Sequence, residues 1–443
     1  MADAAVAMPG RPAPAGASTG NASGSAGGAA LPRSLMALTL LAFFMADVRD
    51  GLGPFLATYL QEHKVQQELI GYTMTAGGLA AVAMTPVAGA WVDRSTAKRT
   101  MTVVAAIAIL AASAVAFSTL DDRWLIASQI VTGVAGALLA ATMAALTLGL
   151  TRASGFKHQT GRNEAWSHAG NMVSAIGAGL MAHLFGAPWM LAVMGAMTVG
   201  AVLSVLAIRA DDIDHQAARG CESAEAVGES AEQQDSDGGW VALLRNKPLL
   251  LFGITCMFFH LGNGAMLPLL NQRLAATVAD SAPLLWTGIA IVVAQITMIP
   301  VALWVSRSKR FDVSWFVFAA ILVLPARGAL AYLIAADWGN VPVQILDGLA
   351  AGALGVATPL MVQRFTQGSG RFNTALGFVM TLQGVGAALS PTLANSIVGS
   401  EQRFGLAFMV LSFAAAVALP MFWWVQRHAP AIHGTQTAQP AQS

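Results

Sequence analysis

The chain contains an internal repeat, and both copies are strongly apolar. Residues 129–133 (QIVTG) return as residues 344–348 (QILDG), and four such pairs of segments lie about 209 to 215 positions apart. A repeated sequence predicts a repeated structural unit, here two pseudo-symmetric halves. Glycines that the copies share, such as Gly133 and Gly348, are expected to belong to the helix-packing scaffold. Two apolar copies of one unit predict a membrane protein built from two helical bundles.

The composition requires a lipid environment for most of the chain. Hydrophobic residues make up 56% and charged residues only 11%, whereas a soluble domain carries about 25% charged residues. An apolar run of about 20 residues spans the hydrocarbon as a helix. Twelve such runs predict an all-α membrane protein with two six-helix bundles. They are 35–60, 69–91, 100–119, 123–150, 163–185, 188–208, 248–271, 284–305, 313–335, 340–363, 372–398 and 403–425.

Basic residues set the expected orientation and the domain plan. Most of the 24 Lys and Arg residues fall in the tails and in loops on one side of the predicted spans. This bias places both termini in the cytoplasm of a multi-pass protein of the cell's inner (plasma) membrane. The plan comprises two disordered cytoplasmic tails, two bundles and an acidic cytoplasmic linker. In chain order these are 1–33 (tail), 34–208 (bundle), 209–247 (linker), 248–427 (bundle) and 428–443 (tail).

Several functional classes find no support in the residues. The net charge of +1 gives no basis for binding nucleic acid. Cys221 and Cys256 lack the spacing of a metal site and are not expected to form a disulfide. There is no phosphate-binding loop and no convincing nucleophile–base set. We therefore expect neither an enzyme nor a bound cofactor or metal.

The loop after the second span carries a recognisable motif. Residues 89–99 (GAWVDRSTAKR) place a glycine four positions before Asp-Arg, followed by a basic pair. This pattern resembles the loop signature of the major facilitator superfamily, with Thr96 in place of the usual second glycine. The resemblance implies a monomeric secondary transporter in the bilayer that takes a small-molecule substrate between its bundles. It assigns a cytoplasmic gate to Gly89, Asp93, Arg94, Lys98 and Arg99.

The same resemblance implies where the gate closes. The family's acid corresponds to Asp93 and lies against the start of span eleven, here residues 371–374, where free backbone N–H groups carry partial positive charge. In the second half, Glu164 is expected to face Arg307 or Lys309 as a mirror gate with exchanged charges. That these residues only set the topology remains an alternative.

Five charged residues fall inside predicted spans, where a charge is costly without a partner or a task. Arg327 and Asp347 lie at similar depth on consecutive spans, so we expect them to pair. Asp47, Arg49 and Asp50 share span one. Three carboxylates against two arginines leave one in excess, and such a carboxylate can carry a proton. Asp47, Asp50 and Asp347 are therefore proton-coupling candidates, with Arg49 and Arg327 as their charge partners; a network that never titrates is the alternative.

Polar residues elsewhere in the spans are candidates to line a substrate cavity: His168, Asn171, His260, Asn263, Gln295 and Gln383. Together these features favour a secondary transporter of a small polar or ionisable organic solute, driven by alternating access and a proton gradient. Two alternatives stay open. One is a proton-coupled drug or metabolite efflux antiporter, and the other is a transporter-like membrane sensor.

Overall fold

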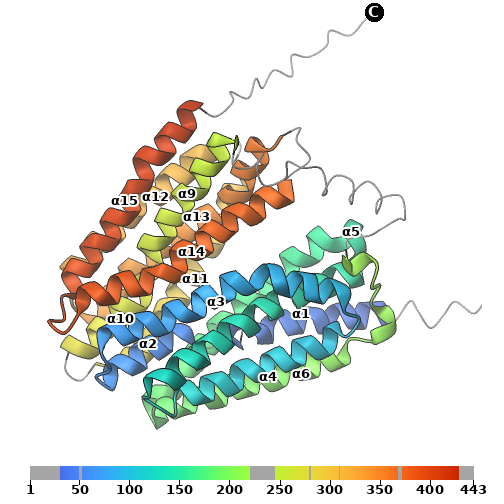
Figure 1. The fold of residues 1–443 in the computed structure, drawn as a ribbon, viewed down its shortest axis with the longest axis horizontal. Helices are drawn as coiled ribbons and strands as arrows, with labels where there is room; N and C mark the ends of the chain where they lie inside the picture. Colours follow the sequence, from blue (N-terminus) through green and yellow to red (C-terminus); the bar gives the residue numbers. More distant parts are fainter. Residues whose placement is uncertain are drawn as a thin grey trace, which may run out of the picture.

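The computed structural model describes residues 30–48, 52–219, 245–278, 281–308, 310–367 and 372–428, and no strand occurs among them (Figure 1). The N-terminal half comprises α1 (Ala30–Val48), α2 (Gly53–Glu62), α3 (Gln67–Arg94), α4 (Lys98–Ala116), α5 (Asp122–Phe185) and α6 (Met190–Ala207). The C-terminal half comprises α9 (Lys247–Asn263), α10 (Met266–Thr277), α11 (Pro283–Arg307), α12 (Val313–Leu333), α13 (Asn340–Phe365), α14 (Phe372–Val398) and α15 (Phe404–His428).

Each half has its own hydrophobic core, so the predicted all-α membrane protein of two bundles is confirmed. In the described part of the chain, ten helical stretches are long and apolar enough to cross a membrane, and residues 31–46 form a shorter apolar helix. Two predicted spans are absent from those ten. The run 35–60 is interrupted between α1 and α2, and 163–185 is the more polar second arm of α5.

Two spans are broken at equivalent places in the repeat. The first falls between α1 and α2, where Leu52 has a φ of 57°. The second falls at Gly264 and Ala265, between α9 and α10, about 215 positions later. The two outer pieces, α2 and α10, pack against each other across the halves (Figure 1).

The long helix α5 turns back at Arg152, whose φ of 52° and ψ of −177° are not helical. Arg152 forms an ion pair of 3.1 Å with Asp214, and the backbone N–H of Asp214 donates to the carbonyl of Gly149 at 2.9 Å. The beginning of the expected linker, residues 209–219, is thus ordered against the N-terminal half. The tails 1–29 and 429–443 and linker residues 220–244 lie outside the described residues, whereas residues 30–33, expected in the tail, are helical.

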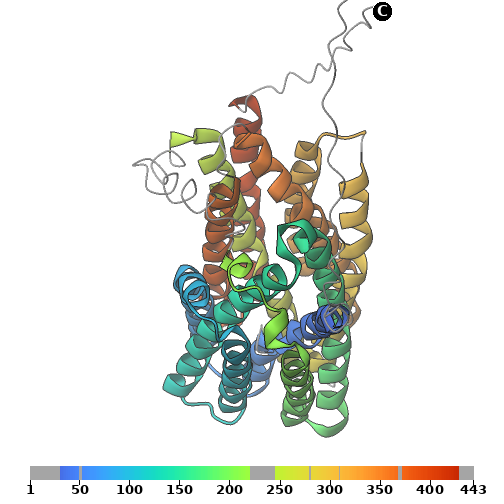
Figure 2. The same cartoon turned by 90° about the vertical axis from the view of Figure 1, so that its right-hand side faces the viewer.

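The two halves touch at one end and part at the other (Figures 1 and 2). We call the end where α1 begins and α15 finishes the terminal end. At the opposite end the hydroxyls of Thr75 and Thr392 lie 2.8 Å apart, across α3 and α14. Towards the terminal end of the same helices, Trp91 is 56% exposed and Met380 is 58% exposed. The structure is therefore closed at the opposite end and open at the terminal end.

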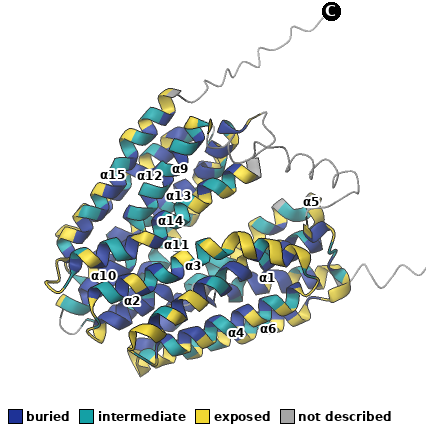
Figure 3. Cartoon of the chain, viewed as in Figure 1, coloured by how far each residue is buried: buried dark blue, intermediate teal, exposed yellow. Residues whose placement is uncertain are grey.

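Large apolar side chains cover the outer faces of the helices. Leu203 of α6 is 61% exposed and Phe413 of α15 is 71% exposed. Exposed residues form bands along the outside of both halves (Figure 3). In water such a surface would be an aggregation hazard, but it suits lipid chains. The structure is that of a multi-pass membrane protein.

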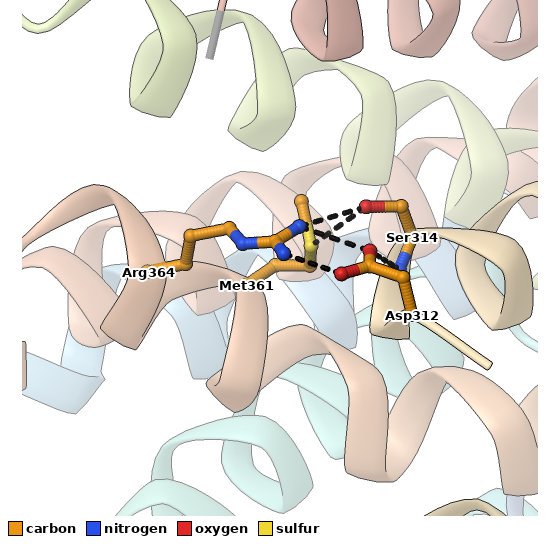
Figure 4. Close-up of polar contacts among 4 residues, drawn as sticks. All are labelled: Asp312, Ser314, Met361 and Arg364. Atoms are coloured by element: carbon orange, nitrogen blue, oxygen red, sulfur yellow. Dashed lines mark hydrogen bonds and ion pairs between the residues drawn. The ribbon is translucent and has the colours of Figure 1, made fainter. Parts of the chain in front are cut away.

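The terminal ends of α12 and α13 are joined by an ion pair (Figure 4). Asp312 caps α12 by accepting from the backbone N–H of Ser314 at 2.9 Å, and its Oδ1 accepts from Nη1 of Arg364 at 3.0 Å. A second bond joins Asp312 Oδ2 to the same guanidinium. This hydrogen bonding by Arg364 lowers the pKa of Asp312 to about 2.

A depressed carboxyl pKa predicts a loss of stability in acid. The contribution of Asp312 is complete above its unfolded pKa of about 4 and is lost as the pH falls towards 2. We expect Asp312→Asn, which retains a capping side chain, to flatten the decline of the thermal midpoint between pH 5 and pH 3. Asp121 is the control, because it also caps a helix but forms no ion pair with another described residue. Asp121→Asn should leave that decline unchanged, and equal slopes for the two variants would refute the assignment.

Candidate functional site

Four side chains form a polar cluster inside the C-terminal half. Arg327 of α12 and Asp347 of α13 form an ion pair of 3.0 Å. Asn263 of α9 donates to Asp347 at 3.2 Å and accepts from Arg327, which also donates to Gln344 at 3.2 Å. We call these four residues the charge cluster. The predicted pairing of Arg327 with Asp347 is confirmed.

The cluster is buried unevenly. Arg327 is 1% exposed, whereas Asp347 is 15% exposed. Three acceptors surround the guanidinium, and this compensation is what a charge inside the membrane requires. Asp347 is the member of the pair that faces open space, so it is the one that a proton or solute can reach.

Asp347 lies on the wall of a cavity of about 230 Å³ between the two halves. The N-terminal half contributes Asn171 of α5 and the start of α2, including Pro54 and Phe55. The C-terminal half contributes Gln295 of α11 beside Asp347. We call this space the central cavity, and its position between the bundles is where transporters of repeat architecture bind their cargo.

Two further cavities adjoin it. The N-half cavity, of about 250 Å³, lies between α1 and both arms of α5, and shares Ala46 with the central cavity. The C-half cavity, of about 300 Å³, lies between α9, α13 and α14, and shares Ala351 with it. Each of the two thus shares a lining residue with the central cavity, and we call the three cavities together the internal route.

The structure brings most of the predicted cavity residues to these walls. Asn171 lines the central cavity, and His260, Asn263 and Gln383 line the C-half cavity. Nδ1 of His260 donates to the carbonyl of Cys256, one turn back on α9, at 2.8 Å. His168 does not line the three cavities, and its Nδ1 is buried without a hydrogen-bond partner.

The predicted gate residues are not engaged across the halves in this conformation. Asp93, Arg94, Glu164 and Arg307 are exposed, and none of them forms an ion pair with another described residue. Their pairing on closure stays a prediction. Arg371 and Lys309, two of the expected partners, lie outside the described residues.

The basic pair that ends the motif makes local contacts in this conformation, and its gate role stays a prediction. Lys98 is buried and donates to the carbonyls of Val92 at 3.0 Å and Ser95 at 2.6 Å, which closes the turn between α3 and α4. Arg99 donates to the carbonyls of Val205 and Leu206 at the end of α6. Gly89 has no neighbour within 4 Å of an added Cβ, so the packing of this conformation does not require a glycine there.

The first-span candidates are not described. Arg49 and Asp50 lie outside the described residues, and of Asp47 the structure gives only its place in α1. The proton-coupling role of these residues stays a prediction from sequence.

One residue of the site was not selected from the sequence as a site residue. Gln344 looked like scaffold because Gln129 occupies the same place in the repeat, yet it accepts from Arg327. Gln295, a predicted cavity residue, lines the central cavity with a buried, unpartnered Oε1.

A cavity between two helical halves, with a buried charge cluster at its wall, defines the class of membrane transporters that bind cargo within the bilayer. The sequence matches the family model of the Major Facilitator Superfamily over residues 37–341, and the chain belongs to this superfamily. An uncharacterised MFS-type transporter of Mycobacterium tuberculosis is 40% identical over 395 residues, which cover 88% of this chain and 92% of the relative.

Solved structures confirm the fold. The nucleoside transporter NupG superposes with a TM-score of 0.72 at 15% identity, covering 89% of this chain and 99% of that structure. A D-xylose–proton symporter superposes with a TM-score of 0.62 at 12% identity, covering 89% and 96%. At such identities the likeness to these structures extends to the fold alone. The family model and the mycobacterial relative identify the protein as a membrane transporter of MFS type.

Proposed function

We propose that the protein moves a small polar or ionisable organic solute by alternating access, with proton movement coupled to transport. The observation that carries this proposal is the placement of Asp347. Its carboxylate is paired with a buried arginine on one side and faces the central cavity on the other. Such a group can exchange its partner for a proton or a solute as the conformation changes.

The mechanism follows from the open and closed ends. With the termini in the cytoplasm, this conformation faces inward, and the contact between Thr75 and Thr392 seals the outer side. Rocking of the halves would separate these residues and bring Asp93 against the start of α14, with Glu164 approaching Arg307. A proton or solute that binds at Asp347 shifts the equilibrium between the inward-facing and outward-facing states only if it binds one of these states more tightly than the other.

A metabolite comparison tests the proposal. We compare solute levels inside and outside cells that carry the chain, the Asp347→Asn variant or neither, each with and without a protonophore. The wild-type chain should change the gradient of one solute or a few related ones, and the protonophore should abolish the change. Identical profiles for wild-type and variant cells, or a gradient that survives the protonophore, would contradict proton-coupled transport through this site.

A further inference from the structure

The charged side chains on the walls of the internal route are carboxylates. Glu164 lines the N-half cavity and Asp347 lines the central cavity. Lys and Arg are absent among the described residues that line the N-half, central and C-half cavities. Walls of one sign in a low-dielectric medium attract the opposite charge and repel their own.

The arginine of the charge cluster lies behind the carboxylate and away from the cavity wall. Arg327 is 1% exposed and does not line the central cavity. Its terminal nitrogens bond Asp347, Asn263 and Gln344, and its Nε is buried without a partner. An entering solute therefore meets the carboxylate first.

Among the residues that line the central cavity, the buried polar atom without a partner is an acceptor. It is Oε1 of Gln295. The described hydrogen bonds of Asp347 both reach Oδ1, from Arg327 and Asn263. A buried acceptor without a partner is costly, so a solute that donates hydrogen bonds gains most from this wall.

Building on the transport function proposed above, we infer that the central cavity selects solutes that donate hydrogen bonds and carry zero or positive charge. Protonated amines are the preferred members, and carboxylates and phosphates are excluded. The inference concerns the sign and hydrogen-bonding character of the cargo and does not depend on the direction of transport.

The potential of the cavity can be measured without knowing the substrate. We place one thiol in the cavity with Gln295→Cys in the full-length protein, in a background of Cys221→Ser and Cys256→Ser. The purified protein is treated at low salt with two thiosulfonate reagents of similar size, one ending in trimethylammonium and the other in sulfonate. The ratio of their rates is divided by the same ratio for a free thiol in solution. Asn171→Cys provides a second position on the opposite wall.

The cationic reagent should be favoured about tenfold at either position, the scale expected for one nearby charge in a partly hydrated site. Adding Asp347→Asn should reduce this preference several-fold. A normalised ratio of one or less, or a ratio unaffected by Asp347→Asn, overturns the inference. So does a transported solute that bears a carboxylate or phosphate. Because the labelling needs no transport, a failed metabolite comparison with an intact ratio refutes the proposed function and leaves the selectivity of the cavity standing.

Discussion

Replacing Arg327 by leucine is expected to be the most damaging single change in the C-terminal half. It leaves Asp347, a largely enclosed carboxylate on the cavity wall, without its ion-pair partner, and the loss of one member of a buried pair costs about 3 to 5 kcal/mol. The variant should show a much lower unfolding midpoint in detergent and little transport. The double variant Arg327→Leu with Asp347→Leu should recover most of the stability, because no charge remains uncompensated, but it should not recover transport.

An exposed pair provides the matched control. Arg403 and Glu401 also form an ion pair, but their side chains are 54% and 68% exposed. Exposed pairs contribute little because water and salt screen them, so Arg403→Leu should leave the midpoint almost unchanged. If Arg327→Leu and Arg403→Leu lower the unfolding midpoint equally, or if Arg327→Leu does not lower it, burial does not determine how much the charge cluster stabilises the protein.

A disulfide at the closed end should stop transport altogether. Thr75 and Thr392 face each other across α3 and α14, so Thr75→Cys with Thr392→Cys should cross-link under mild oxidation in the Cys221→Ser, Cys256→Ser background. If the halves must part here once per cycle, the cross-linked protein should lose at least about 90% of its transport activity. A reductant should restore that activity. The measurement uses the solute identified by the metabolite comparison.

The two single-cysteine variants, oxidised in the same way, control for damage by the oxidant and should keep their activity. A gel shift after proteolysis between the two positions confirms that the link has formed. Unchanged transport by fully cross-linked protein would mean that α3 and α14 stay together throughout the cycle, and alternating access by rocking of the halves would be wrong.

The sequence predicted the architecture better than the helix ends. The repeat and the apolar runs predicted two helical bundles because bilayer thickness dictates span length. The runs could not show that two spans are broken, since the length of a run and its apolar content do not locate a junction inside it. Nor could they show that the fourth and fifth spans follow each other with a kink at Arg152. Arg152 pairs there with Asp214, a residue of the expected linker.

The shared glycines show how far a repeat can be interpreted. A Cβ on Gly133 would lie 2.1 Å from the carbonyl of Gly77, and one on Gly348 would lie 2.6 Å from that of Ala294. Both are close helix crossings, as expected for scaffold. The next shared pair differs, since Gly177 faces Val193 of α6 whereas Gly386 faces Met257 of α9. A shared small residue indicates where space is short, but not which neighbour fills it.

The candidate site was predictable in its charges and less so in its polar partners. Asp347 replaces Thr132 of the other copy, and it lines the central cavity. Arg327 stood out because a charge in a span requires compensation, and Gln295 because a polar side chain in an apolar span is a candidate to line a cavity. Gln344 did not, because an amide inside a span is compatible with either packing or binding. Its role depends on which atoms meet across helices, a property of the tertiary structure.

The junctions within the first and seventh spans have a consequence for how the two halves can move. Leu52 stands in the left-handed region with a φ of 57°, and the helices α9 and α10 meet at Gly264 and Ala265. The outer pieces α2 and α10 pack on each other across the halves, so each is held by the opposite half as well as by its own chain. A movement that parts the halves at this end must therefore either break the contact between α2 and α10 or bend the two spans at these junctions.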